Sequence, residues 1–243
     1  MRKKELLLFC GVEELMIICF ISIACRFHGC PFYLFYNILY GIFASVLCPL
    51  YVLFREKQDL GAAGVKQVGS RQVLVLAAFV LSSIGGQLVP KIAVGETIQW
   101  SVLPVAVFPL TMTTFFEEFL FRGFLQTRIE RQFGPAFAVF LSGLLFSLYH
   151  LGYPGFRTWD DLLLLFAVGI GFALAFQLSD GNLIVSYFVN LPNAFVTYVF
   201  KSEQFPKMTG ESAIYAGVTV LILGFILCAW NRHIKAPAYA GGN

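Results

Sequence analysis

Long apolar runs restrict what this sequence can fold into more than any other feature. A helix needs about 20 apolar residues to cross a bilayer, and eight segments of the 243-residue chain meet that requirement. Only 13% of the residues are charged, against about 25% in soluble domains. The sequence therefore predicts an all-α, polytopic integral membrane bundle. The expected spans cover roughly residues 5–26, 33–54, 72–94, 98–121, 134–151, 161–179, 182–200 and 213–231.

The positions of Lys and Arg predict the orientation of the bundle. With a cytoplasmic N-terminus, 12 of the 17 basic residues lie on the inner side and five on the outer side. The inner set is Arg2, Lys3, Lys4, Arg55, Lys57, Lys66, Arg71, Arg122, Arg128, Arg131, Arg232 and Lys235. The outer set is Arg26, Lys91, Arg157, Lys201 and Lys207. An even number of spans then places both termini in the cytoplasm, and the expected location is a prokaryotic plasma membrane. The net charge of +3 is explained by topology, so no nucleic-acid partner is expected.

Polar residues inside the spans are costly in lipid and therefore need a partner or a function. Glu117, Glu118 and Arg122 lie in the run TTFFEEFLFRGFLQTRIERQFG, residues 113–134. Glu118 and Arg122 are four residues apart, so an ion pair on one helix face would neutralise both. Glu117 lies about 100° away around the helix and cannot easily share that bond. Glu117 therefore has no ionic partner on the same helix face. A partly desolvated carboxylate of this kind suits general acid or base catalysis near neutral pH. A purely structural ion pair at the membrane surface is the alternative.

Three further polar residues lie within spans or at their ends. His150 ends the run LLFSLYH, and Asn190 and Asn193 lie three residues apart in SYFVNLPNAF, roughly on one helix face. Pro192 between the asparagines would kink that helix. Their amides could line a polar cavity, or they could simply bond neighbouring helices together. For His150, the alternative is an interfacial histidine satisfied by backbone or water.

The cost of polar groups in lipid predicts that these side chains meet. We expect one polar intramembrane cavity, open toward the cytoplasm, at the centre of the bundle. The residues expected there are Glu117, Glu118, Arg122, His150 and Asn190. A second acidic pair, Glu13 and Glu14, interrupts the first span and is expected to be a structural or surface feature of a retained helix.

The six cysteines lie within or beside apolar segments, and no CxxC occurs. We interpret them as small buried apolar residues. A disulfide between Cys25 and Cys30 is possible if their loop is extracytoplasmic. The six are Cys10, Cys19, Cys25, Cys30, Cys48 and Cys228.

Two of these motifs, taken together, resemble those of a known family. EEFLFR (117–122) fits the EExxxR motif of the CAAX-processing and bacteriocin-processing intramembrane proteases, the CPBP or Abi family. FSLYH (146–150) fits that family's FxxxH motif at the expected distance, 28 residues after Arg122. DGNLIVSYFVNLPNAF occupies the place of a third motif, in which a histidine is followed four residues later by asparagine. DLGAAGV upstream resembles the family's leading segment, and the resemblance covers about residues 59–200.

The resemblance implies a role for each candidate residue. Glu117 would activate water as a general base, and His150 would help to hold that water. Glu118 and Arg122 would brace the site, and the third motif would stabilise the oxyanion. The chain departs from the family pattern at that motif, because the histidine position is Asn190 and the position four later is Ala194. Asn193 is one residue early. An asparagine amide can donate to an oxyanion, so the substitution either preserves activity or marks a non-catalytic member.

The same residues make a poor zinc site. Catalytic zinc usually takes three protein ligands, mostly histidine. The expected cavity offers one histidine, two glutamates of which one is paired, and asparagines. The sequence therefore favours a hydrolase without a cofactor over a metalloprotease, and zinc remains the alternative.

The sequence thus predicts an intramembrane endopeptidase that hydrolyses a peptide bond of a membrane-associated or lipid-modified peptide through glutamate-activated water. The alternative is a non-catalytic family member, such as a bacteriocin-immunity or accessory membrane protein. A transporter fits the number of spans but lacks paired broken helices in two halves. The expected partners are a membrane-anchored substrate and the lipid bilayer. Residues 1–58 are expected to form two N-terminal helices, 59–205 the catalytic core, and 206–243 a final helix with a short disordered tail from Lys235.

Overall fold

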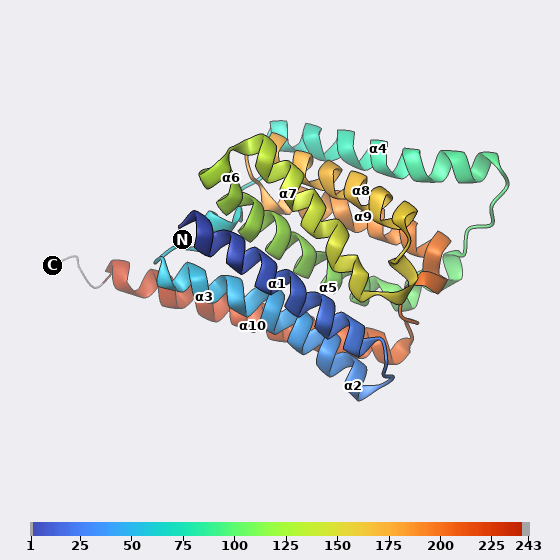
Figure 1. Ribbon diagram of the computed structural model, residues 1–243, viewed down its shortest axis with the longest axis horizontal. Helices are drawn as coiled ribbons and strands as arrows, with labels where there is room; N and C mark the ends of the chain where they lie inside the picture. The colour runs from blue at the N-terminus through green and yellow to red at the C-terminus, as the bar shows by residue number, and fades with distance from the viewer. Residues whose placement is uncertain (1, 240–243) are drawn as a thin grey trace.

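The computed structural model describes residues 2–239, with side chains described as far as Asn231. Eight helical segments in this part of the chain are long and apolar enough to cross a membrane, which confirms the predicted number. They form a single bundle of roughly antiparallel rods (Figure 1). The spans are Lys3–Ala24, Cys30–Arg55, Ser70–Ala93, Trp100–Phe133, Pro135–Gly152, Trp159–Leu178, Leu183–Gln204 and Gly210–Asn231.

Several spans combine α-helix with tighter or wider turns. The α-helices are α1 (Lys3–Ala24), α2 (Cys30–Tyr33), α3 (Cys48–Arg55), α4 (Ser70–Ala93), α5 (Leu103–Glu117), α6 (Thr127–Phe133), α7 (Pro135–Leu148), α8 (Trp159–Leu178), α9 (Leu183–Lys201) and α10 (Gly210–Tyr239). Two segments are π-helical, η1 (Leu34–Leu47) and η4 (Glu118–Gln126). Short 3₁₀ turns occur at η2 (Leu60–Ala63), η3 (Trp100–Val102), η5 (Tyr149–Gly152), η6 (Pro154–Phe156) and η7 (Ser202–Gln204).

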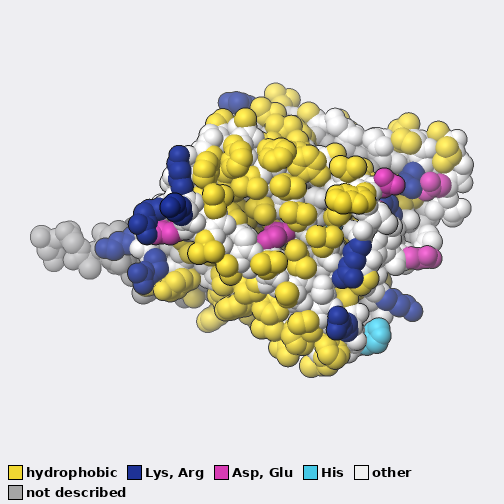
Figure 2. Space-filling view, in the orientation of Figure 1, with side chains coloured by type: hydrophobic (Ala, Val, Ile, Leu, Met, Phe, Trp, Pro, Cys, Tyr) yellow, Lys and Arg dark blue, Asp and Glu magenta, His cyan; other side chains and the backbone are white. Residues whose placement is uncertain are grey.

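The outside of the bundle is apolar, as a membrane requires. Hydrophobic side chains cover a broad band of the face shown in Figure 2, while Lys and Arg gather toward its two ends. Helix α4 is the extreme case, because none of its residues is buried within the protein. It packs mainly against α9. Lipid must therefore cover most of its surface.

One buried cluster holds the bundle together. It contains Leu6 of α1, Tyr40 of η1, Phe121 of η4, Phe176 of α8 and Leu223 of α10. Side chains from residues 1–58, 59–205 and 206–243 thus share a single core. Helix α10 continues to Tyr239, so residues 235–239 of the segment expected to be disordered are helical, and residues 240–243 lie outside the described residues.

The fourth span is longer than predicted, at 34 residues, because η4 and α6 continue α5 without a break. Arg122 lies inside this span and is 0% exposed, so placing it in a cytoplasmic loop was wrong. Without Arg122, 11 basic residues lie on the inner side and five on the outer side, so the count still favours a cytoplasmic N-terminus. Arg232 and Lys235 of the inner set lie beyond the described side chains.

The cysteines are all free, but their predicted burial is correct only for Cys10. Cys19, Cys30 and Cys228 are exposed at the surface of the protein, and Cys25 and Cys48 are half-buried. A small apolar residue in a spanning helix needs shelter from water, and lipid provides that as well as a protein core does. Glu13 and Glu14 are both buried inside the bundle, so the structural alternative holds and the surface one does not.

The polar segment after the second span is anchored to the core. Its 3₁₀ turn η2 packs on η4, where a Cβ built on Gly123 would lie 2.7 Å from the carbonyl oxygen of Ala63. The carbonyl of Gly64 accepts a hydrogen bond from the backbone N–H of Leu183 at 2.8 Å. The Nδ2 of Asn182 donates to the carbonyl of Gln67 at 3.0 Å. This segment ties the start of α9 to η4, which carries the Glu118–Arg122 pair.

Replacing Gly123 with alanine tests this contact. We expect Gly123→Ala to lower the thermal midpoint of the purified protein, at a cost of about 1–3 kcal/mol, because the new methyl group meets a backbone carbonyl that cannot rotate away. Gly217→Ala in α10 is the matched control, since a Cβ there has nothing within 4 Å. Equal midpoints for the two variants would show that η2 can move aside.

Reporter fusions test the predicted orientation. A fusion after Lys57 is expected to report a cytoplasmic location and a fusion after Lys207 an extracytoplasmic one, because the basic residues favour a cytoplasmic N-terminus. The opposite pair of signals would show that the N-terminus is extracytoplasmic and that the bundle has the reverse orientation.

Candidate active site

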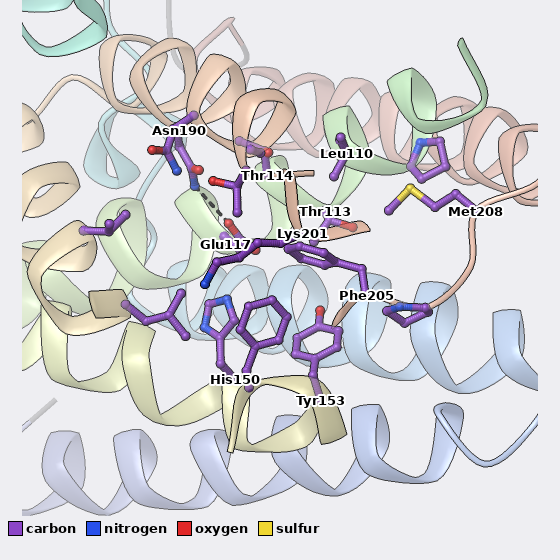
Figure 3. Close-up of a pocket in the computed structure, with 18 of the residues that line it drawn as sticks. Leu110, Thr113, Thr114, Glu117, His150, Tyr153, Asn190, Lys201, Phe205 and Met208 are labelled. Carbon is purple, nitrogen blue, oxygen red and sulfur yellow. Dashed lines mark hydrogen bonds between the residues drawn. The ribbon is translucent and has the colours of Figure 1, made fainter. Parts of the chain in front are cut away.

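A cavity of about 340 Å³ enters the bundle between α4, α5, α8, α9 and the start of α10. Most of its wall is apolar, and polar side chains gather at its inner end. Figure 3 shows Glu117, His150, Tyr153 and Asn190 around it, with Phe205 and Met208 farther along. The expected polar cavity is thus an apolar one with a polar floor.

The mouth of the cavity lies at the end of the bundle opposite the start of α1. Lys91, Lys201 and Lys207 line it, and they lie near the end of α4, at the end of α9 and just before α10. In Figure 1 these segments are far from the first turn of α1 and from the last turns of α10. The two expectations, cytoplasmic termini and a cytoplasmic mouth, therefore cannot both be correct.

The floor of the cavity is formed where α5 passes into the π-helix η4. Glu117 is the last residue of α5 and Glu118 the first of η4. This point lies near the middle of the span Trp100–Phe133. Wide π-type turns inside helices frequently occur at functional sites. The sequence reasoning assumed regular α-helix here, and no local signal in the sequence indicated the wider turn.

Asn190 of α9 connects the two carboxylates. Its Nδ2 donates to Oε2 of Glu117 at 2.9 Å and to Oε1 of Glu118 at 2.8 Å. Asn190 is buried, so both amide hydrogens are used within the protein. The resemblance assigned this position to the oxyanion, but its N–H groups are already committed to the glutamates.

Glu118 and Arg122 form the predicted ion pair, behind the wall of the cavity. Nη1 of Arg122 lies 3.7 Å from Oε1 of Glu118, and both side chains are almost fully buried. Ser186 donates to the other oxygen of Glu118, and Nη2 of Arg122 donates to the carbonyl of Gly169 at 3.0 Å. The guanidinium also lies 4.5 Å from the ring centroid of Phe146. Glu118 and Arg122 thus brace the site without lining the cavity.

Glu117 and His150 line the same part of the cavity (Figure 3). Tyr149 donates its hydroxyl hydrogen to Oε1 of Glu117, and Nδ1 of His150 lies 2.8 Å from the carbonyl oxygen of Phe146. A carbonyl can only accept, so Nδ1 carries the hydrogen and a neutral imidazole presents Nε2 as an acceptor. A carboxylate and a ring nitrogen that both accept hydrogen bonds suit the two hydrogens of one water molecule.

Asn193 lies one helical turn from Asn190 and points to a different helix. Its Oδ1 accepts hydrogen bonds from Ser83, at 2.7 Å, and from Gln87, both on α4. Asn193 also lines the cavity. Its Nδ2 has no partner among the described residues, so this amide offers a free donor where Asn190 does not.

Sequence reasoning missed several residues of the site. Tyr149 stands beside His150, and nothing in the pattern separates it from packing aromatics. Ser186 could have been found, because it precedes Asn190 by four residues and extends the polar face of α9. Ser83 and Gln87 lie in a run that was interpreted only as a span.

The donor set does not fit a resident metal ion. The described residues contain no group of three or more His, Cys, Asp or Glu side chains placed to hold one. Both oxygens of Glu117 and both of Glu118 accept hydrogen bonds from protein groups. Of the carboxylates that line the cavity, Glu117 lies on its floor with His150, and Asp161 is engaged by Lys201 and Thr158, so the floor offers fewer than the three ligands of catalytic zinc. We therefore derive no step through a metal.

The buried ion pair yields a stability prediction. Arg122→Met is expected to destabilise the protein by about 3–5 kcal/mol, because it leaves the charge of Glu118 without a cation. Adding Glu118→Gln should recover part of that loss, which thermal unfolding in detergent can measure. No recovery in the double variant would mean that the arginine acts through its contacts with Phe146 and Gly169 instead.

One comparison with known families finds a match. Residues 99–193 match the family described as type II CAAX prenyl endopeptidase, Rce1-like. The matched segment includes Glu117, Glu118, Arg122, His150, Asn190 and Asn193. No curated protein sequence matches the chain significantly. Over this segment, the chain is similar to the type II CAAX prenyl endopeptidases, and the match supports assigning it to the CAAX-processing and bacteriocin-processing (CPBP) intramembrane proteases.

Proposed function

We propose that this protein is a glutamate-dependent endopeptidase that works within the membrane. One observation carries the proposal. The Glu117 carboxylate lies at the inner end of an apolar intramembrane cavity, held by Tyr149 and Asn190 beside the free Nε2 of His150. A general base must be oriented and partly shielded from bulk water. Glu117 is held by Tyr149 and Asn190 and is buried, which supports this role.

The reaction follows from these positions. A water molecule donates one hydrogen bond to Glu117 and the other to Nε2 of His150. Its oxygen attacks the carbonyl carbon of the substrate peptide while Glu117 accepts the proton, which gives a tetrahedral oxyanion. Glu117 then transfers that proton to the leaving nitrogen as the C–N bond breaks. The products are a carboxylic acid and an amine, and Glu117 is again ionised.

The oxyanion needs a donor that is already oriented. Asn190 is unsuitable in this arrangement, because its amide hydrogens hold Glu117 and Glu118. Asn193 is the better candidate, since its Nδ2 is free and lies on the wall of the same cavity. The oxyanion role implied for the third motif thus passes from Asn190 to Asn193.

The cavity also indicates the kind of substrate. Its wall includes Leu110, Met112, Phe156 and Met208, while Lys201 lies toward the mouth. Such a surface suits an apolar or lipid-modified peptide segment that approaches from the membrane. A membrane-associated peptide is therefore the proposed substrate class.

A non-catalytic role is the second candidate, and the asparagine at position 190 favours it. The family pattern has histidine there, and its replacement could mark a member that binds peptides through the same cavity without cutting them. Activity measurements separate the two proposals.

Glu117→Gln is the direct test of the catalytic proposal. Glutamine preserves the size of the side chain but cannot accept the proton, so cleavage should fall at least ~10²-fold, the usual scale for losing a general base. Cleavage can be followed with a quenched fluorescent peptide that ends in a prenylated CAAX sequence, and by terminal-peptide mass spectrometry of membranes. Glu130→Gln is the matched control, because Glu130 lies on α6 and bonds Gln177 outside the cavity.

Three results would contradict the proposal. Equal cleavage by the wild type and Glu117→Gln would remove Glu117 from the mechanism. Complete inhibition by a chelator, reversed by added zinc, would return the protein to the metalloproteases. A wild type that cuts neither the probe nor any membrane peptide would favour the non-catalytic role.

A further inference from the structure

A hydrogen-bond chain that runs from Thr197 of α9 through Gln87 of α4 ends on the amide of Asn193. We infer that Gln87 is a positioning residue that sets the direction of this amide, so that its N–H groups and not its oxygen face the reacting carbonyl. The inference rests on the proposed function, in which Asn193 stabilises the oxyanion. Gln87 lies outside residues 99–193, so the family match does not include it.

The chain runs in one direction through three residues. The hydroxyl of Thr197 donates to Oε1 of Gln87 at 3.0 Å. Nε2 of Gln87 then donates to Oδ1 of Asn193, and Ser83 donates to the same oxygen at 2.7 Å. Oδ1 of Asn193 is thereby held toward α4 by two donors. The NH₂ group on the other side of the amide is left facing away from α4.

This direction matters for catalysis. An amide has a donor end and an acceptor end of nearly the same shape. If Asn193 turned over, its carbonyl oxygen would face the developing negative charge, which would destabilise the intermediate. Preorganised donors are effective because they need no reorientation during the reaction. Gln87 provides that preorganisation, since its own amide is oriented by Thr197.

The location of Gln87 supports the assignment. Helix α4 has no buried residue, yet Gly86, Gln87, Pro90 and Lys91 reach the cavity wall. Gln87 is the member of this group that bonds two polar residues of α9. A glutamine that only fastened α4 to its neighbour would not need a particular direction.

Gln87→Glu tests the direction of the Asn193 amide without removing the side chain that links Thr197 to Asn193. The introduced carboxylate has the same shape but only accepts hydrogen bonds. It can still accept from Thr197, but it must attract the NH₂ of Asn193 and turn Oδ1 into the cavity. We expect kcat for the quenched prenylated CAAX peptide to fall ~10²-fold or more, the scale for losing an oxyanion donor. KM should change by less than about threefold, because the interaction is made in the transition state.

Two further variants exclude simpler causes. Gln99→Glu adds the same charge in an exposed loop at the mouth end of the bundle and should leave kcat unchanged. Gln87→Met removes the donor without adding charge. It should lower kcat about tenfold, since Ser83 alone still orients Asn193.

A double-variant cycle separates positioning from a structural role. Asn193→Ala should lower kcat ~10²–10³-fold, and adding Gln87→Glu should then lower it by no more than about threefold, because Gln87 acts through Asn193. Additive losses, or a loss confined to KM, would overturn the inference. So would full activity of Gln87→Glu. The proposed function fails separately, through Glu117→Gln, and that result does not depend on Gln87.

Discussion

Two neighbouring carboxyl groups at the middle of an apolar helix carry a desolvation cost that the rest of the fold must offset. Buried charge is tolerated only where partners and hydrogen bonds surround it. Here the donors come from three directions: Arg122 from the same helix, Ser186 and Asn190 from α9, and Tyr149 from the turn after α7. Each helix that supplies a donor must hold its position. The packing of α5, α7 and α9 is therefore tied to the environment of the two glutamates.

The same bonds divide the two glutamates by environment. Glu118 is enclosed and engaged by cationic and hydroxyl groups, which suits a bracing role. Glu117 receives neutral donors and retains one side toward the cavity. Adjacent residues of the same type can thus serve different purposes because the helix presents them to different neighbours. Asn190 joins the two environments by donating to both.

Much of this arrangement could be predicted from the sequence. The spans follow from apolar length, and the Glu118–Arg122 pair follows from four-residue spacing, because both properties are local. The π-helical turn at Glu118 was missed, since nothing nearby in the sequence encodes the extra width. The different uses of Asn190 and Asn193 were also missed. They depend on which helices lie beside α9, and that is a property of the whole bundle.

The conflict between cytoplasmic termini and a cytoplasmic mouth has a related reason. Charge counts give the orientation of the chain, but they do not say at which end a cavity opens. Because the mouth is opposite the start of α1, a cytoplasmic N-terminus implies that substrates reach Glu117 from the outer side. Cleavage would then follow translocation of the substrate.

The bare surface of α4 has a practical consequence for work with the purified protein. This helix buries no side chain of its own, yet it carries Ser83 and Gln87 to Asn193. Much of its lateral support must come from the surrounding acyl chains. Detergents with short or loosely packed tails support it less well than a bilayer. A preparation could then keep its other helices intact and still turn over slowly, and nanodiscs of graded lipid thickness would reveal the difference.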